Sequence, residues 1–239
     1  MGLGYADNVG IDGAGNPYPG GEAGYESQLV ALLDRIKATQ TGRTLLGFFR
    51  LRNHTAWFVP VSGNMSREGV GGALSNLRLT TRRGAPLFTG SGTRVRIGQF
   101  GRGVGADSVI DFQPELWNYP PSAFQGPEQV IVHELFHAMR QTFGAIRNTP
   151  LAGFITVEEL FAVFVENMFL NETGRPLRGN YHEGGAGTSP DHAMAHNPSF
   201  HAPMRDLTAM MPTIVHALAQ VATNYNPFRD WLAVARTTP

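Results

Sequence analysis

The stretch Val130–Gly144 (VIVHELFHAMRQTFG) constrains the fold more than any other part of the chain. It is apolar on most sides and, before its final glycine, contains neither proline nor glycine, which is typical of a buried helix. Gly126-Pro127-Glu128 supplies a helix start and Gly144 supplies a helix stop. We therefore expect a buried helix here, against which the other elements of the chain pack.

The predicted helix carries His133, Glu134 and His137 in the arrangement H-E-x-x-H. Histidines four residues apart lie on one face of a helix, so both imidazoles can reach one metal ion. Glu134 lies about 100° further round the helix, from where its carboxylate reaches a metal-bound water without being a ligand. Buried imidazoles and carboxylates need partners. The pattern therefore predicts a zinc site with Glu134 as general base, rather than a solvated helix that carries two histidines by chance.

The third zinc ligand is expected in the helix predicted at Thr156–Leu170. Catalytic zinc usually has three protein ligands and a water, and a chain without cysteine must use His, Asp or Glu. This helix carries Glu158, Glu159 and Glu166. We expect Glu159 to be the ligand because it follows His137 by 22 residues, an interval similar to that of thermolysin-like enzymes.

A second interpretation of Glu159 comes from the residues around it. Thr156-x-x-Glu159 is also a capping box, in which case Glu158 or a later group would be the ligand. Ala162 is small and would let the two helices approach closely. Glu166 is seven residues after Glu159 and so on the same face, where it is expected to bond the free ring N–H of a ligand histidine.

The segment 175–203 combines glycine and proline with four of the eight histidines in the chain. This composition predicts a loop, and loops on a rigid scaffold commonly carry functional groups. A zinc peptidase needs a donor that stabilises the oxyanion of the tetrahedral intermediate. Tyr181 and His182 are the candidates, whereas the other histidines are expected to be solvated surface residues.

The remaining periodicity predicts one α+β domain with a zincin-like arrangement. We expect a small antiparallel sheet, the active-site helix packed against it, and a helical C-terminal part. Residues 1–26 are rich in glycine and are predicted to be a flexible leader, so that 27–239 form the metallopeptidase domain. The expected elements are helices at Ser27–Thr39, Thr44–Arg52 and, divided at Pro212, Met204–Ala235, with strands at Ala56–Val61, Leu77–Leu79, Thr93–Ile97 and Ser108–Phe112.

For two of these strands the sequence also predicts a position within the sheet. Pro60 marks Ala56–Val61 as an edge strand or a strand end, because proline cannot donate to a sheet. Ser108–Phe112 is the last strand before the active-site helix. It is either an edge strand that receives the substrate as an added strand or part of an ordinary core hairpin.

Charge and hydropathy exclude several functional classes. Lys+Arg and Asp+Glu both number 19, so the chain has no net charge, whereas a general nucleic-acid-binding protein would show a basic surplus. No segment reaches the roughly 18 consecutive apolar residues of a membrane span. The N-terminus lacks the basic and apolar regions of a signal peptide. If the protein acts outside its own cell, delivery machinery or a parent polypeptide is expected to carry it there.

Four motifs in a fixed order extend over about residues 27–185 of the chain. They are Thr39-x-Thr41-Gly42-Arg43-x-Leu45-Leu46, His133-Glu134-Leu135-Phe136-His137-Ala138, Glu158-Glu159 with Glu166-Asn167, and Gly174-Arg175-Pro176-x-Arg178-x-x-Tyr181. This ordered set resembles the NleD-type zinc metalloproteases, which are effectors of bacterial type III secretion, and related metallopeptidase modules of bacterial toxins. The resemblance implies a single-zinc endopeptidase that is delivered into another cell. The segment after 181 has no counterpart in those families, so the substrate is not implied.

Motif, helix and resemblance together predict a zinc-dependent metalloendopeptidase that is secreted or translocated into a target cell. Its partners are expected to be a protein or peptide substrate and a delivery system. The alternatives are a metallohydrolase that acts on peptidoglycan peptides and a non-catalytic binding module with a structural zinc. The intact Glu134 disfavours the binding module, since a structural zinc site has no use for a base.

The sequence makes a direct prediction about metal content. We expect the purified protein to hold about one zinc ion per chain. The double variant His133→Ala/His137→Ala removes both imidazole ligands and should abolish most of this binding. Metal analysis after dialysis measures the change, and full zinc retention in the double variant would contradict the predicted site.

Overall fold

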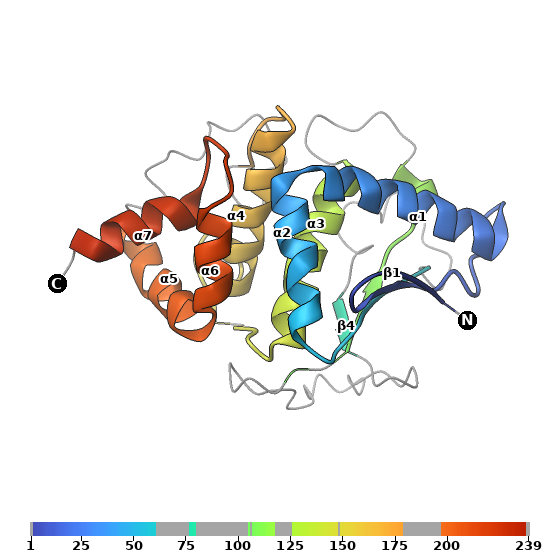
Figure 1. The fold of residues 1–239 in the computed structure, drawn as a ribbon, viewed down its shortest axis with the longest axis horizontal. Helices are drawn as coiled ribbons and strands as arrows, with labels where there is room; N and C mark the ends of the chain where they lie inside the picture. Colours follow the sequence, from blue (N-terminus) through green and yellow to red (C-terminus); the bar gives the residue numbers. More distant parts are fainter. Residues whose placement is uncertain are drawn as a thin grey trace.

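A mixed sheet and a set of helices make up the α+β fold of the computed structural model (Figure 1). The structure describes residues 2–60, 77–79, 105, 107–117, 126–147, 149–178 and 197–237. The strands are β1 (Leu3–Ala6), β2 (Val9–Ile11), β3 (Ala56–Val59), β4 (Leu77–Leu79) and β5 (Ser108–Asp111). The helices are α1 (Gly21–Ala38), α2 (Gln40–Phe48), α3 (Pro127–Thr142), α4 (Val157–Glu172), α5 (Pro198–Met210), α6 (Pro212–Ala219) and α7 (Pro227–Thr237), with short 3-10 helices η1 (Phe49–Leu51) and η3 (Pro114–Trp117).

The sheet has the strand order β1-β2-β3-β5-β4. Strands β2, β3 and β5 are parallel, whereas β1 and β4 pair antiparallel to β2 and β5. The prediction of an antiparallel sheet is therefore wrong. The chain between β2 and β3 passes through α1 and α2, and a crossover of this kind is what allows two strands to run parallel. The periodicity of single strands carries no information about this connection.

Both expectations of an edge strand are also wrong. Strand β3 pairs with β2 and β5, and β5 pairs with β3 and β4, so each has neighbours on both sides. Pro60 follows β3 and marks the end of that strand, which was the other interpretation of this proline. The strand expected at 77–79 is confirmed as β4, and it is the last strand in the order. The strand expected at 93–97 lies outside the described residues.

The predicted flexible leader at 1–26 is wrong for residues 2–26, which form β1, β2 and the start of α1. Strand β2 pairs with β3, and both Val9 and Ile11 are buried in the core. Glycine in this segment has a packing role, because a Cβ on Gly10 would overlap the ring of Trp57. The sequence pattern misled because glycine is common both in flexible segments and where a backbone packs against a large side chain.

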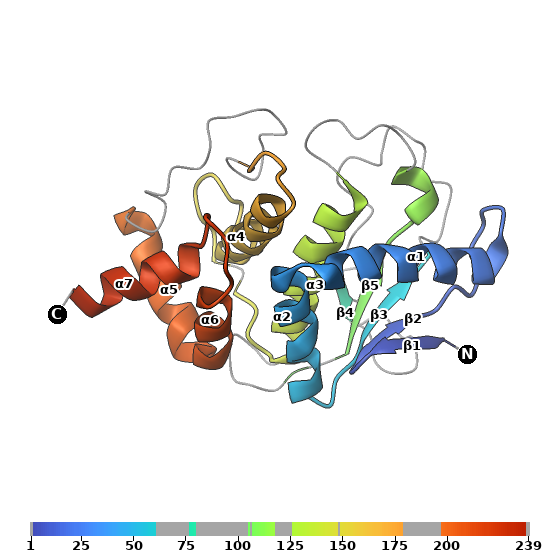
Figure 2. The same cartoon turned by 45° about the horizontal axis from the view of Figure 1, so that its top comes forward.

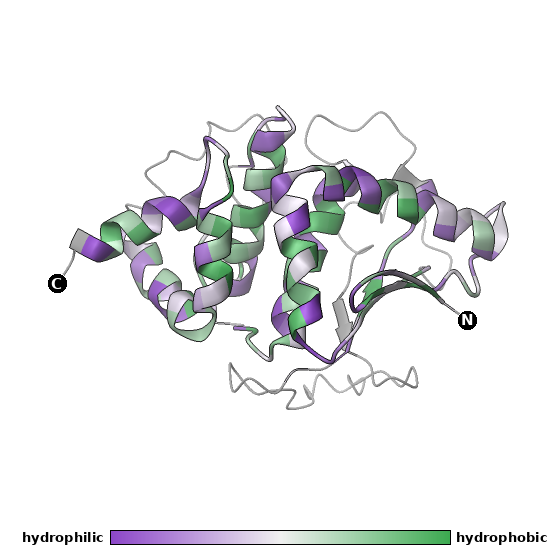
Figure 3. Cartoon of the chain, in the orientation of Figure 1, coloured by the Kyte–Doolittle hydropathy of each residue, from purple (hydrophilic) through white to green (hydrophobic). Residues whose placement is uncertain are grey.

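Helices α3 and α4 lie between the sheet and the C-terminal helices (Figure 2). Helix α3 begins at Pro127 after Gly126, and Gly144 follows it with a positive φ of 64°. Helix α4 begins after Thr156, whose side chain accepts a hydrogen bond from the backbone of Glu159. Hydrophobic residues dominate the interior helices (Figure 3). These helices and their start and stop signals confirm the sequence-based prediction.

The C-terminal part is helical, as predicted. Pro212 starts α6 and separates it from α5, and Pro227 starts α7. These helices lie at the end of the molecule opposite the sheet (Figures 1 and 2). None of the helices that the structure describes is long and apolar enough to cross a membrane.

The junction between α1 and α2 depends on the Thr39-x-Thr41-Gly42-Arg43 motif. The hydroxyl of Thr39 accepts a hydrogen bond from the Gly42 N–H at 3.0 Å. Arg43 Nη1 donates to the Ala38 carbonyl at 2.7 Å and so caps the end of α1. A Cβ on Gly42 would lie 2.0 Å from the Ile36 carbonyl oxygen. The motif therefore joins two helices whose backbones touch.

Two glycines in α2 provide a matched test of this junction. Gly42→Ala should lower the free energy of unfolding by about 1–3 kcal/mol, because the added methyl overlaps fixed backbone. A Cβ on Gly47 in the same helix meets, among the described residues outside its own helix backbone and chain neighbours, no atom within 4 Å. Gly47→Ala should therefore raise the free energy of unfolding by about 0.5–1 kcal/mol. Chemical denaturation measures both. Equal effects of the two substitutions would contradict a role for Gly42 in helix contact.

Candidate metal centre

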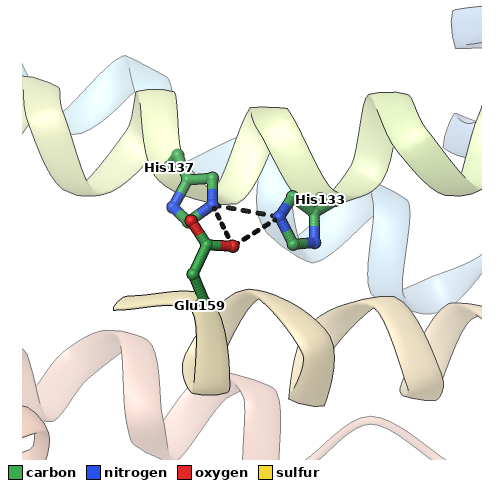
Figure 4. A group of neighbouring side chains, drawn as sticks. All are labelled: His133, His137 and Glu159. Atoms are coloured by element: carbon green, nitrogen blue, oxygen red, sulfur yellow. Dashed lines mark hydrogen bonds and ion pairs between the residues drawn. The ribbon is translucent and has the colours of Figure 1, made fainter. Parts of the chain in front are cut away.

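His133, His137 and Glu159 converge on one point between α3 and α4 (Figure 4). His133 Nε2 lies 3.0 Å from Glu159 Oε2 and 3.1 Å from His137 Nε2. His137 Nε2 lies 3.4 Å from the same glutamate oxygen. Both histidines are buried, whereas the Glu159 side chain is 22% exposed. The three residues form a buried group that can hold a metal ion, open to solvent on the glutamate side.

The spacing of these three atoms fits a small metal ion. Zinc binds imidazole nitrogen and carboxylate oxygen at about 2.0–2.2 Å, which places tetrahedral ligand atoms about 3.3 Å apart. The observed separations are 3.0–3.4 Å. Three protein ligands leave one tetrahedral position for water or substrate.

The imidazole of His133 is held from behind by Glu166. His133 Nδ1 donates a hydrogen bond to Glu166 Oε2 at 2.9 Å, so this proton leaves the Nε2 lone pair directed at the site. Glu166 also accepts from Gln129 Nε2 and forms an ion pair with Arg178 at 3.2 Å. The hydrogen bond that the sequence predicts between Glu166 and a histidine of the H-E-x-x-H pattern is present.

Glu158 lies behind His137 and is directed away from the convergence point. Its Oε1 is 3.6 Å from His137 Nδ1, beyond hydrogen-bonding range but close enough for strong electrostatic attraction. The same oxygen accepts a hydrogen bond from Arg140 Nε at 2.6 Å. Of the two neighbouring glutamates, Glu159 is therefore the one whose carboxylate faces both histidines.

The capping interpretation and the ligand interpretation of Glu159 are compatible. Thr156 Oγ1 accepts a hydrogen bond from the Glu159 backbone N–H at 3.3 Å. The Glu159 carboxylate instead faces the two histidines. One residue thus uses its backbone in the helix cap and its side chain in the site. Ala162, one turn further along α4, is fully buried, as expected at a close helix contact.

Opposite charges shift the pKa values of the two histidines and of the three glutamates that surround them. Burial alone would lower the pKa of both imidazoles, but hydrogen bonds to Glu159 and Glu166 raise the pKa of His133 overall. At His137, too, the lowering of the pKa by burial is smaller than the effect of Glu158 and Glu159, which raise the pKa to about 10. Burial raises the pKa of the three carboxyls, yet the neighbouring cations lower it overall. The cluster therefore attracts cations, and a metal ion that binds here displaces protons.

Glu134 is buried on α3, directly after His133. Its charge contributes to the raised pKa of His137, which places the carboxylate in the electrostatic neighbourhood of the site. Its predicted role as general base remains a prediction. Tyr181 and His182, the expected oxyanion donors, lie outside the described residues.

Sequence reasoning missed the cations that complete the cluster. Arg140 is fully buried and contacts Glu158, and Arg178 contacts Glu166. Arg140 lies three residues after His137, on the same face of α3. A charged residue on the buried face of a helix was therefore the available signal. Arg178 was visible only as part of a motif.

No protein-family model matches the chain, and no curated protein matches it either. Function is therefore inferred from the residues of the site and their geometry.

Substitution of the two neighbouring glutamates separates the ligand from its neighbour. Glu159→Ala removes the carboxylate oxygen that faces both imidazoles and should cause a much larger loss of bound metal than Glu158→Ala. Thr156→Ala serves as a control for the helix cap and should cost about 1 kcal/mol of stability while metal is retained. Metal analysis measures the bound metal of each variant, and thermal unfolding measures its stability. A Glu158→Ala protein that loses more metal than Glu159→Ala would contradict the assignment.

Proposed function

We propose that this protein is a single-zinc metalloendopeptidase with a zincin-like site, in which His133, His137 and Glu159 hold the zinc. The observation that carries the proposal is the convergence of these three donors, two of which come from an unbroken H-E-x-x-H run on a buried helix that also carries Glu134. The donors are two imidazoles and one carboxylate, a set that zinc uses in catalytic sites.

The number of donors favours a catalytic site over a structural one. Structural zinc is almost always held by four protein ligands, whereas catalytic zinc has three and a water. In the described part of the chain, the group that can hold a metal has three residues. Glu158, the nearest further carboxylate, is engaged by Arg140. This arrangement supports a site that has room for water and substrate.

The proposed chemistry divides among the residues of the site. A zinc ion held by His133, His137 and Glu159 would supply Lewis-acid chemistry at this site. Glu134 would act as the general base toward the attacking water and would return the proton to the amine that leaves. Glu166, behind His133, keeps the ring proton on Nδ1 and so orients the imidazole. Tyr181 or His182 stays the predicted donor to the oxyanion.

The sheet suggests where a peptide substrate would bind. Strand β4 is the last in the strand order and packs beside α3. An extended peptide can add to a strand edge through main-chain hydrogen bonds. Among the described strands, β4 therefore offers the edge at which we propose that the substrate binds, whereas β5, the strand considered from the sequence, has a strand on each side.

The proposed biological setting follows from the resemblance to NleD-type effectors and toxin modules. In that setting the protein is delivered into a target cell by a secretion system or a parent toxin, and cleaves proteins there. The ordered motifs support this setting.

Glu134→Gln tests whether the site is catalytic. The substitution keeps size and hydrogen bonding but removes the base, and a positioned general base contributes typically about 10²–10⁴-fold. We expect normal zinc content, normal thermal stability and loss of nearly all cleavage, measured as new N-termini in a target-cell protein extract. Glu128→Gln on the same helix is the matched control, because Glu128 pairs with Arg35 at the surface. If Glu134→Gln produces the same N-termini as the wild type, zinc hydrolysis is not the activity.

A further inference from the structure

Arg140 is the largest fully buried polar side chain in the described structure, and the proposed reaction does not use it. A buried guanidinium is tolerated only when its charge and its N–H groups are satisfied. Arg140 Nε donates to Glu158 Oε1 at 2.6 Å, and Nη2 donates to the Ala145 carbonyl at 2.5 Å. The guanidinium also lies 5.2 Å from the ring centroid of Phe161. These contacts fix Arg140 between α3, α4 and the segment that joins them.

Glu158 connects Arg140 to the candidate metal centre, because the same carboxylate oxygen contacts Arg140 and lies beside His137. Its Oε2 accepts a hydrogen bond from the Arg147 backbone N–H at 3.0 Å. Its Oε1 lies between two cationic groups, 2.6 Å from Arg140 Nε and 3.6 Å from His137 Nδ1. The shorter contact is with Arg140. The position of this oxygen beside the imidazole is therefore set by Arg140 and by the backbone of Arg147.

The two histidines of the site are supported differently. His133 donates directly to Glu166 at 2.9 Å. His137 lacks such a short contact with Glu158, so its ring depends on where the carboxylate is held. A carboxylate behind a ligand histidine fixes the ring and makes it a stronger donor, and loss of such a partner typically lowers metal affinity by about 10- to 100-fold.

We propose that Arg140 is a positioning residue of the metal centre, which acts on His137 through Glu158. The inference rests on the proposed metal-binding function. Arg140 holds Glu158 Oε1 beside His137 Nδ1, and the ring then presents Nε2 to the point shared with His133 and Glu159. It touches neither metal nor substrate. If the ion pair served only to stabilise the α3–α4 junction, its removal would lower stability without a specific effect on metal binding.

A double-mutant cycle tests the chain of contacts. The variants are Arg140→Met, which keeps length and apolar packing, Glu158→Gln, which keeps shape without charge, and the two combined. Zinc affinity is measured by competition with a chelator, and the ligand field by the visible absorption of the protein loaded with Co²⁺. The melting temperature of the metal-free protein is measured in parallel. Asn226→Ala is the control, because Asn226 is buried among C-terminal carbonyls and its loss destabilises the fold away from the site.

We expect Arg140→Met and Glu158→Gln each to weaken zinc binding by about 10- to 100-fold and to shift the Co²⁺ spectrum in the same way. The double variant should be no weaker than Glu158→Gln alone. Because the double variant removes both buried charges, it leaves no unpaired charge in the core. Its zinc affinity therefore tests the proposal even if Arg140→Met alone does not fold. Arg140→Lys keeps the charge and should recover part of the affinity. Asn226→Ala should lower the melting temperature with wild-type zinc affinity and spectrum.

Two results would overturn the proposal. One is wild-type zinc affinity and Co²⁺ spectrum in Arg140→Met or in the double variant. The other is a double variant whose loss equals the product of the two single losses, which would mean that Arg140 does not act through Glu158. A wild-type protein that binds zinc but cleaves nothing would overturn the peptidase function alone. A wild-type protein that binds no zinc would overturn the metal centre and this proposal together.

Discussion

The convergence of three electron-pair donors in a buried space is the constraint on which the rest of the structure depends. Two imidazole nitrogens and a carboxylate oxygen lie 3.0–3.4 Å apart between α3 and α4. Three unprotonated donors this close repel one another unless a proton or a metal ion lies between them, and burial makes the repulsion stronger. The two helices must therefore be held together by contacts elsewhere. Apolar residues along both helices, with the small Ala162 at the interface, provide those contacts.

Around the two histidines, acidic and basic side chains alternate. Behind each histidine lies a buried glutamate, and behind each glutamate lies an arginine: Glu166 and Arg178 at His133, Glu158 and Arg140 at His137. The negative charge of Glu158 and of Glu166 is thereby balanced by an arginine, on the side away from the point where His133, His137 and Glu159 converge. The alternation places an acidic partner beside the Nδ1 atom of each imidazole, on the side away from the point where the three donors converge.

The four ordered motifs of the sequence divide into two kinds in this structure. Gly42 and Arg43 hold α1 and α2 in contact and lie outside the metal cluster. Gly174 has a positive φ of 67° just after α4, and Arg178 pairs with Glu166. The motifs thus include residues that join helices of the scaffold as well as residues of the candidate metal centre. A motif of this kind is informative because a close backbone contact restricts side chains as strongly as a ligand position does.

The sequence by itself determined the local features: the H-E-x-x-H helix, its start at Pro127 and the start of α4 after the Thr156 cap. These depend on residues within one or two turns of each other, where helical periodicity and capping chemistry act. The sequence favoured Glu159 but left Glu158 open, and the structure shows that Glu159 is the one whose carboxylate faces both imidazoles. Only the tertiary structure decided that β3 and β5 are interior parallel strands, that the glycine-rich start packs into the sheet, and that Arg140 and Arg178 reach the glutamates behind the histidines. Strand neighbours and buried ion pairs join residues far apart in the chain, and the periodicity of a single segment does not record which distant segment will lie beside it.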